Sequence, residues 1–363
     1  MQNIINIIVF VLVIGSIITI HEFGHFIAAK CFGVYCSQFS IGFGPKLFSK
    51  KGKETEFELR LLPIGGFVAM AGEADQEDNE DMKDVPFERT LQGKKAYQRV
   101  IIFLAGVFMN FVLAFTVLFA SNFFGGEVPL NIVQIGEIQS NSPAEQYGLM
   151  VDDIIEKMYI EESDKTFLIS SYDDLPDVFN KETFGTTTDT IHTIITVKRG
   201  DETKDLNVVM KYNETTERYL LGITHKTRSM TLVESLKYTI IDVADMSTSI
   251  VDALKQLVVN FSSTVKQLSG PAGIYTVTAE VTETGQITYI FRLLGLLSIN
   301  IGIFNLLPIP GLDGYQVLLT IAERIVGREL PQKVKLALQL AGLALVMLLM
   351  IFVTYQDLMR IWG

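Results

Sequence analysis

The chain opens with an apolar segment, residues 4–29, that reads IINIIVFVLVIGSIITIHEFGHFIAA. It is long enough to cross the hydrocarbon core of a bilayer as a helix, which takes about 20 residues. Near its end it carries His21, Glu22 and His25. Ionisable groups within a membrane span are costly and are functional candidates by default. This segment therefore predicts a membrane protein and also the place of its chemistry.

Three further segments are apolar over a similar length, at about 100–124, 287–307 and 336–352. The mean hydropathy of +0.32 exceeds what an ordinary soluble domain needs. We expect a multi-pass α-helical membrane protein with about four transmembrane helices, a membrane-associated β-region and an external α+β domain. The predicted divisions are transmembrane helix 1 (1–29), the β-region with an acidic loop (30–97), transmembrane helix 2 (98–124), the external domain (125–224), external amphipathic helices (225–284), transmembrane segment 3 (285–326), and a cytoplasmic loop with transmembrane helix 4 (327–363).

Basic residues indicate how the chain crosses the membrane. They are dense between the first two crossings, among them Lys46, Lys94 and Arg99, and the positive-inside rule places them in the cytoplasm. The N-terminus, residues 125–284 and the C-terminus are then expected outside. The net charge of −11 comes partly from an acidic run at residues 73–84. This charge predicts neither nucleic acid nor an anionic membrane surface as a partner. The apolar segments predict the lipid bilayer as a partner.

Between the first two crossings, residues 39–45 (FSIGFGP) and 56–72 (EFELRLLPIGGFVAMAG) combine β-favouring residues with glycines. This pattern is typical of short strands and tight turns. Polar backbone at membrane depth is tolerated only where protein or a wet cavity surrounds it. A region that dips into the membrane beside the first helix would offer a free strand edge.

The external segment has a different pattern. Residues 142–158 (SPAEQYGLMVDDIIEKM) predict a short helix followed by a strand, and residues 190–199 and 206–212 predict further strands. Residues 230–268 carry apolar residues at helical spacing, which predicts amphipathic helices against the membrane surface.

The motif HEFGH is typical of a zinc site. Two histidines four apart on a helix face one metal ion, and the glutamate between them can act as general base toward a water molecule. A catalytic zinc site usually takes three protein ligands. Asp313, in residues 305–314 (NLLPIPGLDG), is the best third candidate, although a carboxylate after two prolines and a glycine also suits a turn or a helix cap.

These motifs, their order and their placement resemble the site-2 protease family of intramembrane zinc metalloproteases, in particular the bacterial members of the regulator of sigma-E protease type with an external PDZ domain. The resemblance rests on HEFGHFIAAKCFGV, FSIGFGPKLF, RLLPIGGFVAM, Gly106 to Asn110, SGPAGI and NLLPIPGLDG. It departs from the family at Val107, where a proline is usual, and at Tyr315, where a second glycine is usual. Neither departure removes a candidate metal ligand.

The resemblance implies a function. His21, His25 and Asp313 would bind Zn²⁺, Glu22 would be the catalytic base, and Asn305 would act at the active site or serve packing. The β-region would hold an extended substrate by edge pairing, and Leu61, Gly65, Gly66 and Phe67 are its candidate substrate-binding residues.

The partners implied are single-pass membrane proteins, such as trimmed anti-sigma factors or remnant signal peptides, and an upstream site-1-type protease. The implied location is the bacterial inner membrane, with the active site near the cytoplasmic face. SPAEQYGL resembles a PDZ domain, which in this family filters substrates or binds peptide ends. The alternatives are a catalytically silent membrane scaffold with a PDZ adaptor, a metal transporter, and a soluble zincin on a membrane anchor.

Two smaller features also allow predictions. Cys31 and Cys36 lie at the cytoplasmic end of the first crossing, where we expect no disulfide. Arg292, a few residues into the third crossing, is expected to extend outward to water, and the alternative is an ion pair with an acidic residue of the external helices.

Overall fold

The computed structural model describes residues 2–73, 82, 84–171, 179–260, 264, 269–328 and 330–362. The chain forms two compact units, one of Met1–Phe124 with Val233–Gly363 and the other of Gly125–Leu232. Most of the predicted acidic run, and residues 261–263 and 265–268 of the predicted amphipathic stretch, lie outside the described residues.

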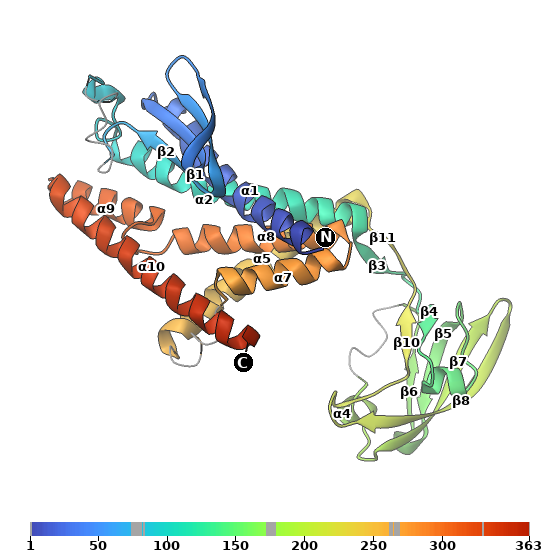
Figure 1. The fold of residues 1–363 in the computed structure, drawn as a ribbon. Helices are drawn as coiled ribbons and strands as arrows, with labels where there is room; N and C mark the ends of the chain where they lie inside the picture. Colours follow the sequence, from blue (N-terminus) through green and yellow to red (C-terminus); the bar gives the residue numbers. More distant parts are fainter. Residues whose placement is uncertain are drawn as a thin grey trace. The chain divides into compact units, whose positions relative to one another are not determined.

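Among the described residues of the first unit, four helices are long and apolar enough to cross a membrane (Figure 1). They are α1 (Gln2–Cys31), α2 (Ala96–Gly125), α8 (Ile287–Asn305) and α10 (Gln332–Trp362). The prediction of a membrane protein with about four spanning helices is thereby confirmed. Cys31 and Cys36 are both free thiols, as predicted.

Within the predicted transmembrane segment 3, the chain forms two helices. α8 ends at Asn305, and α9 (Asp313–Val326) begins after Pro308 and Pro310. Proline has no N–H to donate and its ring clashes with the preceding turn, so two prolines two residues apart end the helix. This break places Asp313 at the first residue of a new helix.

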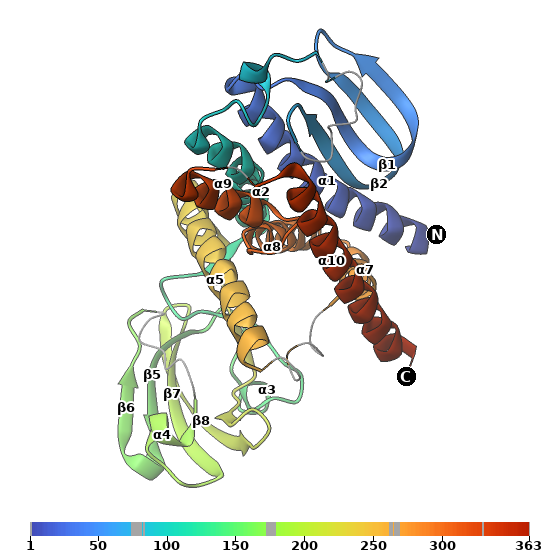
Figure 2. The same cartoon turned by 90° about the vertical axis from the view of Figure 1, so that its left-hand side faces the viewer.

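Strands β1 (Cys36–Lys51) and β2 (Glu56–Met70) are much longer than the short strands that the sequence predicted. They are antiparallel and curl on each other (Figure 2), so that each contributes two segments to the sheet. Residues 36–41 pair with 66–70 on one side and with 56–59 on the other, while residues 46–51 pair with 56–60. Among the described residues, 66–70 therefore has a strand partner on one side only. The predicted free strand edge exists at this segment.

α5 (Leu232–Val259) and α7 (Pro271–Glu283) complete the first unit, with the short 3₁₀ helix η2 (Phe87–Arg89) before α2. The apolar side of α5 packs against buried residues of α2 and α8, including Leu118 and Ile299, whereas the sequence predicted contact with the membrane surface. Arg292 lies 3.2 Å from Asp242 of α5, measured from Nη2 to Oδ1. The expected extension to water gives way to the ion pair, because α5 packs where it brings a carboxylate within reach.

The second unit is built on a five-stranded antiparallel sheet of order β6-β5-β7-β8-β9. Its predicted helix–strand pair is present as α3, capped by the Ser142 hydroxyl, followed by β5. The two pairs β4–β10 and β3–β11 extend this unit to Leu232, beyond the predicted boundary at residue 224. Its elements are β3 (Glu127–Pro129), β4 (Ile135–Ile138), α3 (Pro143–Gln146), β5 (Ile154–Ile160), η3 (Glu161–Ser163), β6 (Lys165–Leu168), α4 (Lys181–Phe184), β7 (Thr190–Arg199), β8 (Glu202–Asn213), β9 (Arg218–Tyr219), β10 (Ile223–His225) and β11 (Thr227–Ser229).

Candidate metal centre

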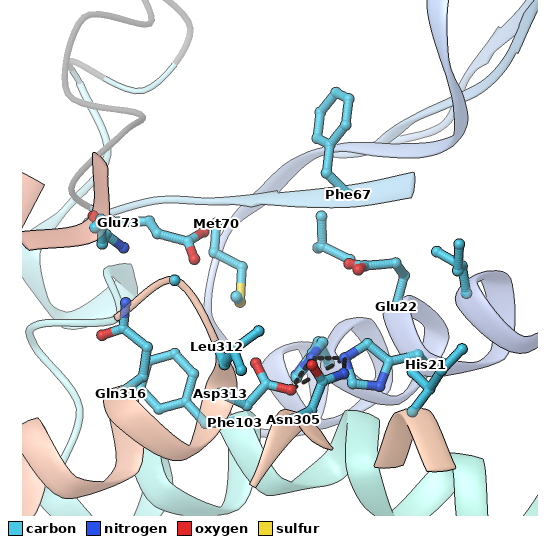
Figure 3. A pocket seen from close by; sticks show the side chains of 16 residues that line it. His21, Glu22, Phe67, Met70, Glu73, Phe103, Asn305, Leu312, Asp313 and Gln316 are labelled. Carbon is cyan, nitrogen blue, oxygen red and sulfur yellow. Dashed lines mark hydrogen bonds and ion pairs between the residues drawn. The ribbon is translucent and has the colours of Figure 1, made fainter. Parts of the chain in front are cut away.

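Three side chains from two helices converge on one point in the first unit (Figure 3). His21 and His25 lie one turn apart on α1, and their Nε2 atoms are 3.2 Å from each other. The Asp313 Oδ2 atom lies 3.1 Å from Nε2 of His21 and 3.3 Å from Nε2 of His25. The HEFGH spacing brings the two rings together, and the proline break brings the carboxylate to them.

These separations fit a single small cation. Ligand atoms about 2.0–2.1 Å from a tetrahedral zinc ion are about 3.3 Å from each other. The Asp313 Oδ2 atom is buried and has no hydrogen-bond partner in the described part of the chain. A buried carboxylate oxygen without a donor is costly unless a cation or a proton completes it. Two imidazole nitrogens and one carboxylate oxygen also form a donor set that zinc accepts.

The Nδ1 atom of each of the two histidine rings also has a polar neighbour. Nδ1 of His25 lies 2.8 Å from the backbone carbonyl oxygen of Ile102, to which it can donate its proton. Nδ1 of His21 lies 3.3 Å from the amide nitrogen of Asn110, a fully buried residue of α2 whose Oδ1 atom has no partner among the described residues. Turning that amide over puts the oxygen beside the ring nitrogen, where it accepts the Nδ1 proton. Both imidazoles are then oriented with Nε2 toward the common point.

Gly106, on α2, lies directly beneath the two rings. A Cβ atom built there would lie 2.4 Å from Nε2 of His25 and 2.8 Å from Cε1 of His21. Because real Cβ atoms do not approach other atoms so closely, any side chain at this position displaces the histidines. The absence of a side chain at residue 106 therefore leaves the space that the two rings occupy.

Glu22 and Asn305 stand beside the three converging residues. Both line a cavity of about 410 Å³ together with His21, His25 and Asp313. The Glu22 carboxylate lies close to the backbone amide of Val68 in β2. The Asn305 amide nitrogen, at the end of α8, lies 3.3 Å from Nε2 of His21. The cavity thus holds a carboxylate and an amide that are not in the cluster of three.

The four predicted substrate-binding residues differ in their placement. Phe67 lines the cavity, but its ring points away from the histidines (Figure 3). A Cβ atom on Gly66 would lie 3.3 Å from Cγ of Glu22, so β2 passes close to this side chain. Leu61, which is exposed, and Gly65 are not among the residues that line the cavity.

Sequence reasoning did not assign a role to Asn110, Gly106 or Met70, all of which contact or line this site. Gly106 and Asn110 are four residues apart and therefore share one face of α2. This spacing could have indicated that the two residues act at one place, but the sequence does not show which helix this face of α2 contacts.

Comparison with known proteins agrees with the geometry. The model of peptidase family M50 matches residues 9–349. The regulator of sigma-W protease RasP of Bacillus subtilis is 30% identical, over 98% of this chain and 99% of the relative. The zinc metalloprotease RasP of Bacillus licheniformis is 29% identical over the same shares, 98% and 99%. A candidate zinc metalloprotease of Clostridium acetobutylicum is 32% identical over 97% of each chain.

Proposed function

Because the chain belongs to peptidase family M50, the family of the site-2 proteases that its motifs resemble, we propose that it is a zinc-dependent endopeptidase that cuts single-pass membrane proteins within the bilayer. The observation that carries this proposal is the convergence of two imidazoles and one carboxylate beside Glu22. His21 and His25 belong to an apolar helix that is long enough to span a membrane. Relatives of this chain are named as zinc metalloproteases, which supports zinc as the metal.

His21, His25 and Asp313 would hold the ion, and Asn110 and the Ile102 carbonyl would hold the two rings. A zinc ion bound there supplies Lewis acidity, which activates water near neutral pH and polarises a peptide carbonyl. The protein supplies the geometry for this chemistry, because packing fixes both rings before any substrate arrives.

Glu22 is the proposed general base. It lies in the same cavity as the three ligand residues, where its carboxylate can take a proton from the attacking water and pass it to the leaving amine. β2 passes close to this side chain, since a Cβ atom on Gly66 would lie 3.3 Å from Cγ of Glu22. Asn305 offers an amide N–H group on the other side of the cavity, suited to orient a carbonyl or to stabilise negative charge that develops on it.

Substrate would bind as an added strand. A transmembrane helix hides its peptide groups in internal hydrogen bonds, so a segment must unwind before its carbonyl can be attacked. Residues 66–70 present a strand edge within the first unit, and Val68 and Met70 of this edge line the cavity. Edge pairing binds a peptide through its main chain and is tolerant of sequence. Gly66 and Phe67 lie at the start of this edge.

The charge pattern and the family support a proposed topology and a proposed physiological role. The basic residues between α1 and α2 support an active site near the cytoplasmic face, with the N-terminus and the unit Gly125–Leu232 outside. We assign that unit as a PDZ-like domain that filters substrates. Its supporting features are the SPAEQYGL motif and its antiparallel sheet. Trimmed anti-sigma factors or remnant signal peptides are the proposed substrates in the bacterial inner membrane, and the sigma-W name of the Bacillus subtilis relative favours the former.

Reconstitution of the protein with a single-pass substrate in vesicles tests the proposal. Glu22→Gln keeps the shape of the side chain but removes the base, so it should retain one zinc ion per chain and slow cleavage by about 10²–10⁴-fold. Glu54→Gln is the matched control, because Glu54 lies on the turn between β1 and β2 and pairs with Lys30 outside the cavity. Cleavage at the wild-type rate by Glu22→Gln would show that the base is another group. A wild-type protein that binds no zinc would favour the silent scaffold.

A further inference from the structure

A second cavity, of about 320 Å³, lies between the start of α2 and the end of α9, which lie side by side in Figures 1 and 2. It is distinct from the candidate metal centre, with which it shares no lining residue. Its lining is dominated by basic side chains. The basic residues are Lys94, Lys95, Arg99, Arg324 and Arg328.

Among the described residues of the lining, the acidic one is Glu323, and Lys335 and Arg99 already engage its carboxylate. Its carboxylate lies 2.8 Å from Nζ of Lys335 and 3.4 Å from Nη2 of Arg99. Lys95, Arg324 and Arg328 are exposed and form no ion pair with a carboxylate in the described part of the chain. Among the described residues that line the cavity, basic side chains therefore outnumber the single carboxylate.

An apolar surface adjoins this charge. Leu318, Ile321 and Ile325 lie on one face of α9, at positions i, i+3 and i+7, and are 51%, 43% and 80% exposed. Tyr97, in the first turn of the spanning helix α2, is 57% exposed, as is typical of aromatic residues at the membrane–water boundary. An amphipathic helix with basic residues beside an apolar face lies in the interfacial plane of a bilayer.

We propose that this cavity binds the phosphate-bearing headgroup of an anionic phospholipid, with an acyl chain along the apolar face of α9. Basic pockets beside spanning helices on the cytoplasmic side have the charge to hold such a headgroup. Arginine donates two parallel hydrogen bonds to a phosphate group, which suits Arg324 and Arg328 to this role. Free phosphate has the same charge chemistry but would make no use of the exposed apolar side chains, so the lipid is the occupant that both observations favour.

Native mass spectrometry of the full chain in detergent tests the proposal. The probes are phosphatidylglycerol, phosphatidylcholine with the same acyl chains, and inorganic phosphate. The wild type should retain phosphatidylglycerol in preference to phosphatidylcholine. The double variant Arg324→Gln/Arg328→Gln should bind phosphatidylglycerol about 30-fold more weakly, which corresponds to two charges at about 1 kcal/mol each.

Two further variants keep the result interpretable. Arg324→Lys/Arg328→Lys retains the charge and should retain most of the affinity, which excludes a folding defect as the cause of loss. Lys51→Gln/Lys53→Gln removes the same charge from exposed positions at the β1–β2 turn, outside the cavity, and should bind as the wild type does. Equal loss in this control, or no loss in the arginine pair, overturns the proposal. Inorganic phosphate that binds as tightly as the lipid identifies a soluble anion site and overturns the assignment to lipid.

Discussion

Asp153 and Asp313 are both largely buried, one in each unit of the molecule, and their surroundings differ. Asp153 accepts two hydrogen bonds of 2.7 Å from Arg199 and one of 2.9 Å from the Met150 amide. Asp313 meets two imidazoles, and its Oδ2 atom has no hydrogen-bond donor among the described residues. The first carboxylate has its hydrogen-bond donors within the protein, whereas the Oδ2 atom of the second faces two imidazole nitrogens, as expected of the proposed zinc ligand. Burial alone thus does not distinguish the two aspartates, but an unsatisfied oxygen that faces two imidazole nitrogens does.

Substitution of each aspartate by a neutral residue should produce the largest effects, and the two effects should differ in kind. Asp313→Ala removes a proposed ligand and should lower zinc affinity by more than about 100-fold. Substitution of a residue that only hydrogen-bonds to a metal ligand already lowers metal affinity by about 10–100-fold. Cleavage should fall to background. Zinc content and cleavage of the purified protein measure both effects.

Asp153→Asn should instead keep zinc and lower the free energy of unfolding of the unit Gly125–Leu232 by about 2 kcal/mol. This loss is smaller than for an ion pair in which both side chains are deeply buried, because the Arg199 side chain is partly exposed. Thermal unfolding followed by limited proteolysis measures this change. Loss of zinc in Asp153→Asn, or its retention in Asp313→Ala, would reverse the assignment of the two carboxylates.

Gly106 tests whether packing against the histidine rings also affects zinc affinity. Gly106→Ala should lower zinc affinity by about 10–100-fold, since the new Cβ atom displaces His25, whose Nε2 atom would be only 2.4 Å away. Gly302→Ala is the control, because its Cβ atom meets nothing closer than 3.4 Å and it also lies within a membrane-spanning helix. A competitive zinc titration of the two variants measures the difference, and equal affinities would show that α2 does not constrain the rings.

Asn110 tests whether orientation of His21 matters. Asn110→Ala removes the proposed acceptor of the His21 Nδ1 proton. We expect zinc affinity to fall by about 10-fold, which is the lower end of the range for substitutions of residues that hydrogen-bond to a metal ligand. Asn122→Ala, on the same helix, removes hydrogen bonds to Thr239 and Asp242 instead. It should lower stability and leave zinc affinity unchanged. The same titration distinguishes the two, and a zinc defect in Asn122→Ala alone would contradict the role of Asn110.

The smallest effect is expected at Glu54, where hydrogen bonds from Lys30 and then Arg89 hold the pKa of the carboxyl below its ordinary value. A carboxyl whose pKa is lower in the folded state stabilises the protein above its unfolded pKa, and this contribution is lost as pH falls through the folded value. Because Glu54 is partly exposed, Glu54→Gln should cost about 0.5 kcal/mol or less at pH 7. Its melting temperature should meet that of the wild type at low pH, and a gap that widens there would be the wrong sign.

Some features follow from local patterns in the sequence. Apolar length predicts the four spanning helices, and the four-residue spacing of His21 and His25 predicts rings on one side of a helix. Two prolines predict a break before Asp313. Other features depend on packing between distant segments. The curl of β1 on β2 and the approach of Gly106 to the histidines arise only when these elements meet, and no spacing in the chain encodes the partner. Arg292 was misjudged for the same reason, since Asp242 is brought to it by the packing of α5.

X-ray absorption spectroscopy at the zinc edge of the purified, zinc-loaded protein tests the central claim most directly. We expect the zinc ion to be surrounded by two nitrogen atoms at about 2.0–2.1 Å and by oxygen at about 2.0–2.2 Å, with no sulfur. Asp313→Ala should lose this signal, and Glu22→Gln should keep it. A sulfur contribution at about 2.3 Å, from Cys31 or Cys36, or a shell of oxygen alone would contradict the centre proposed for His21, His25 and Asp313.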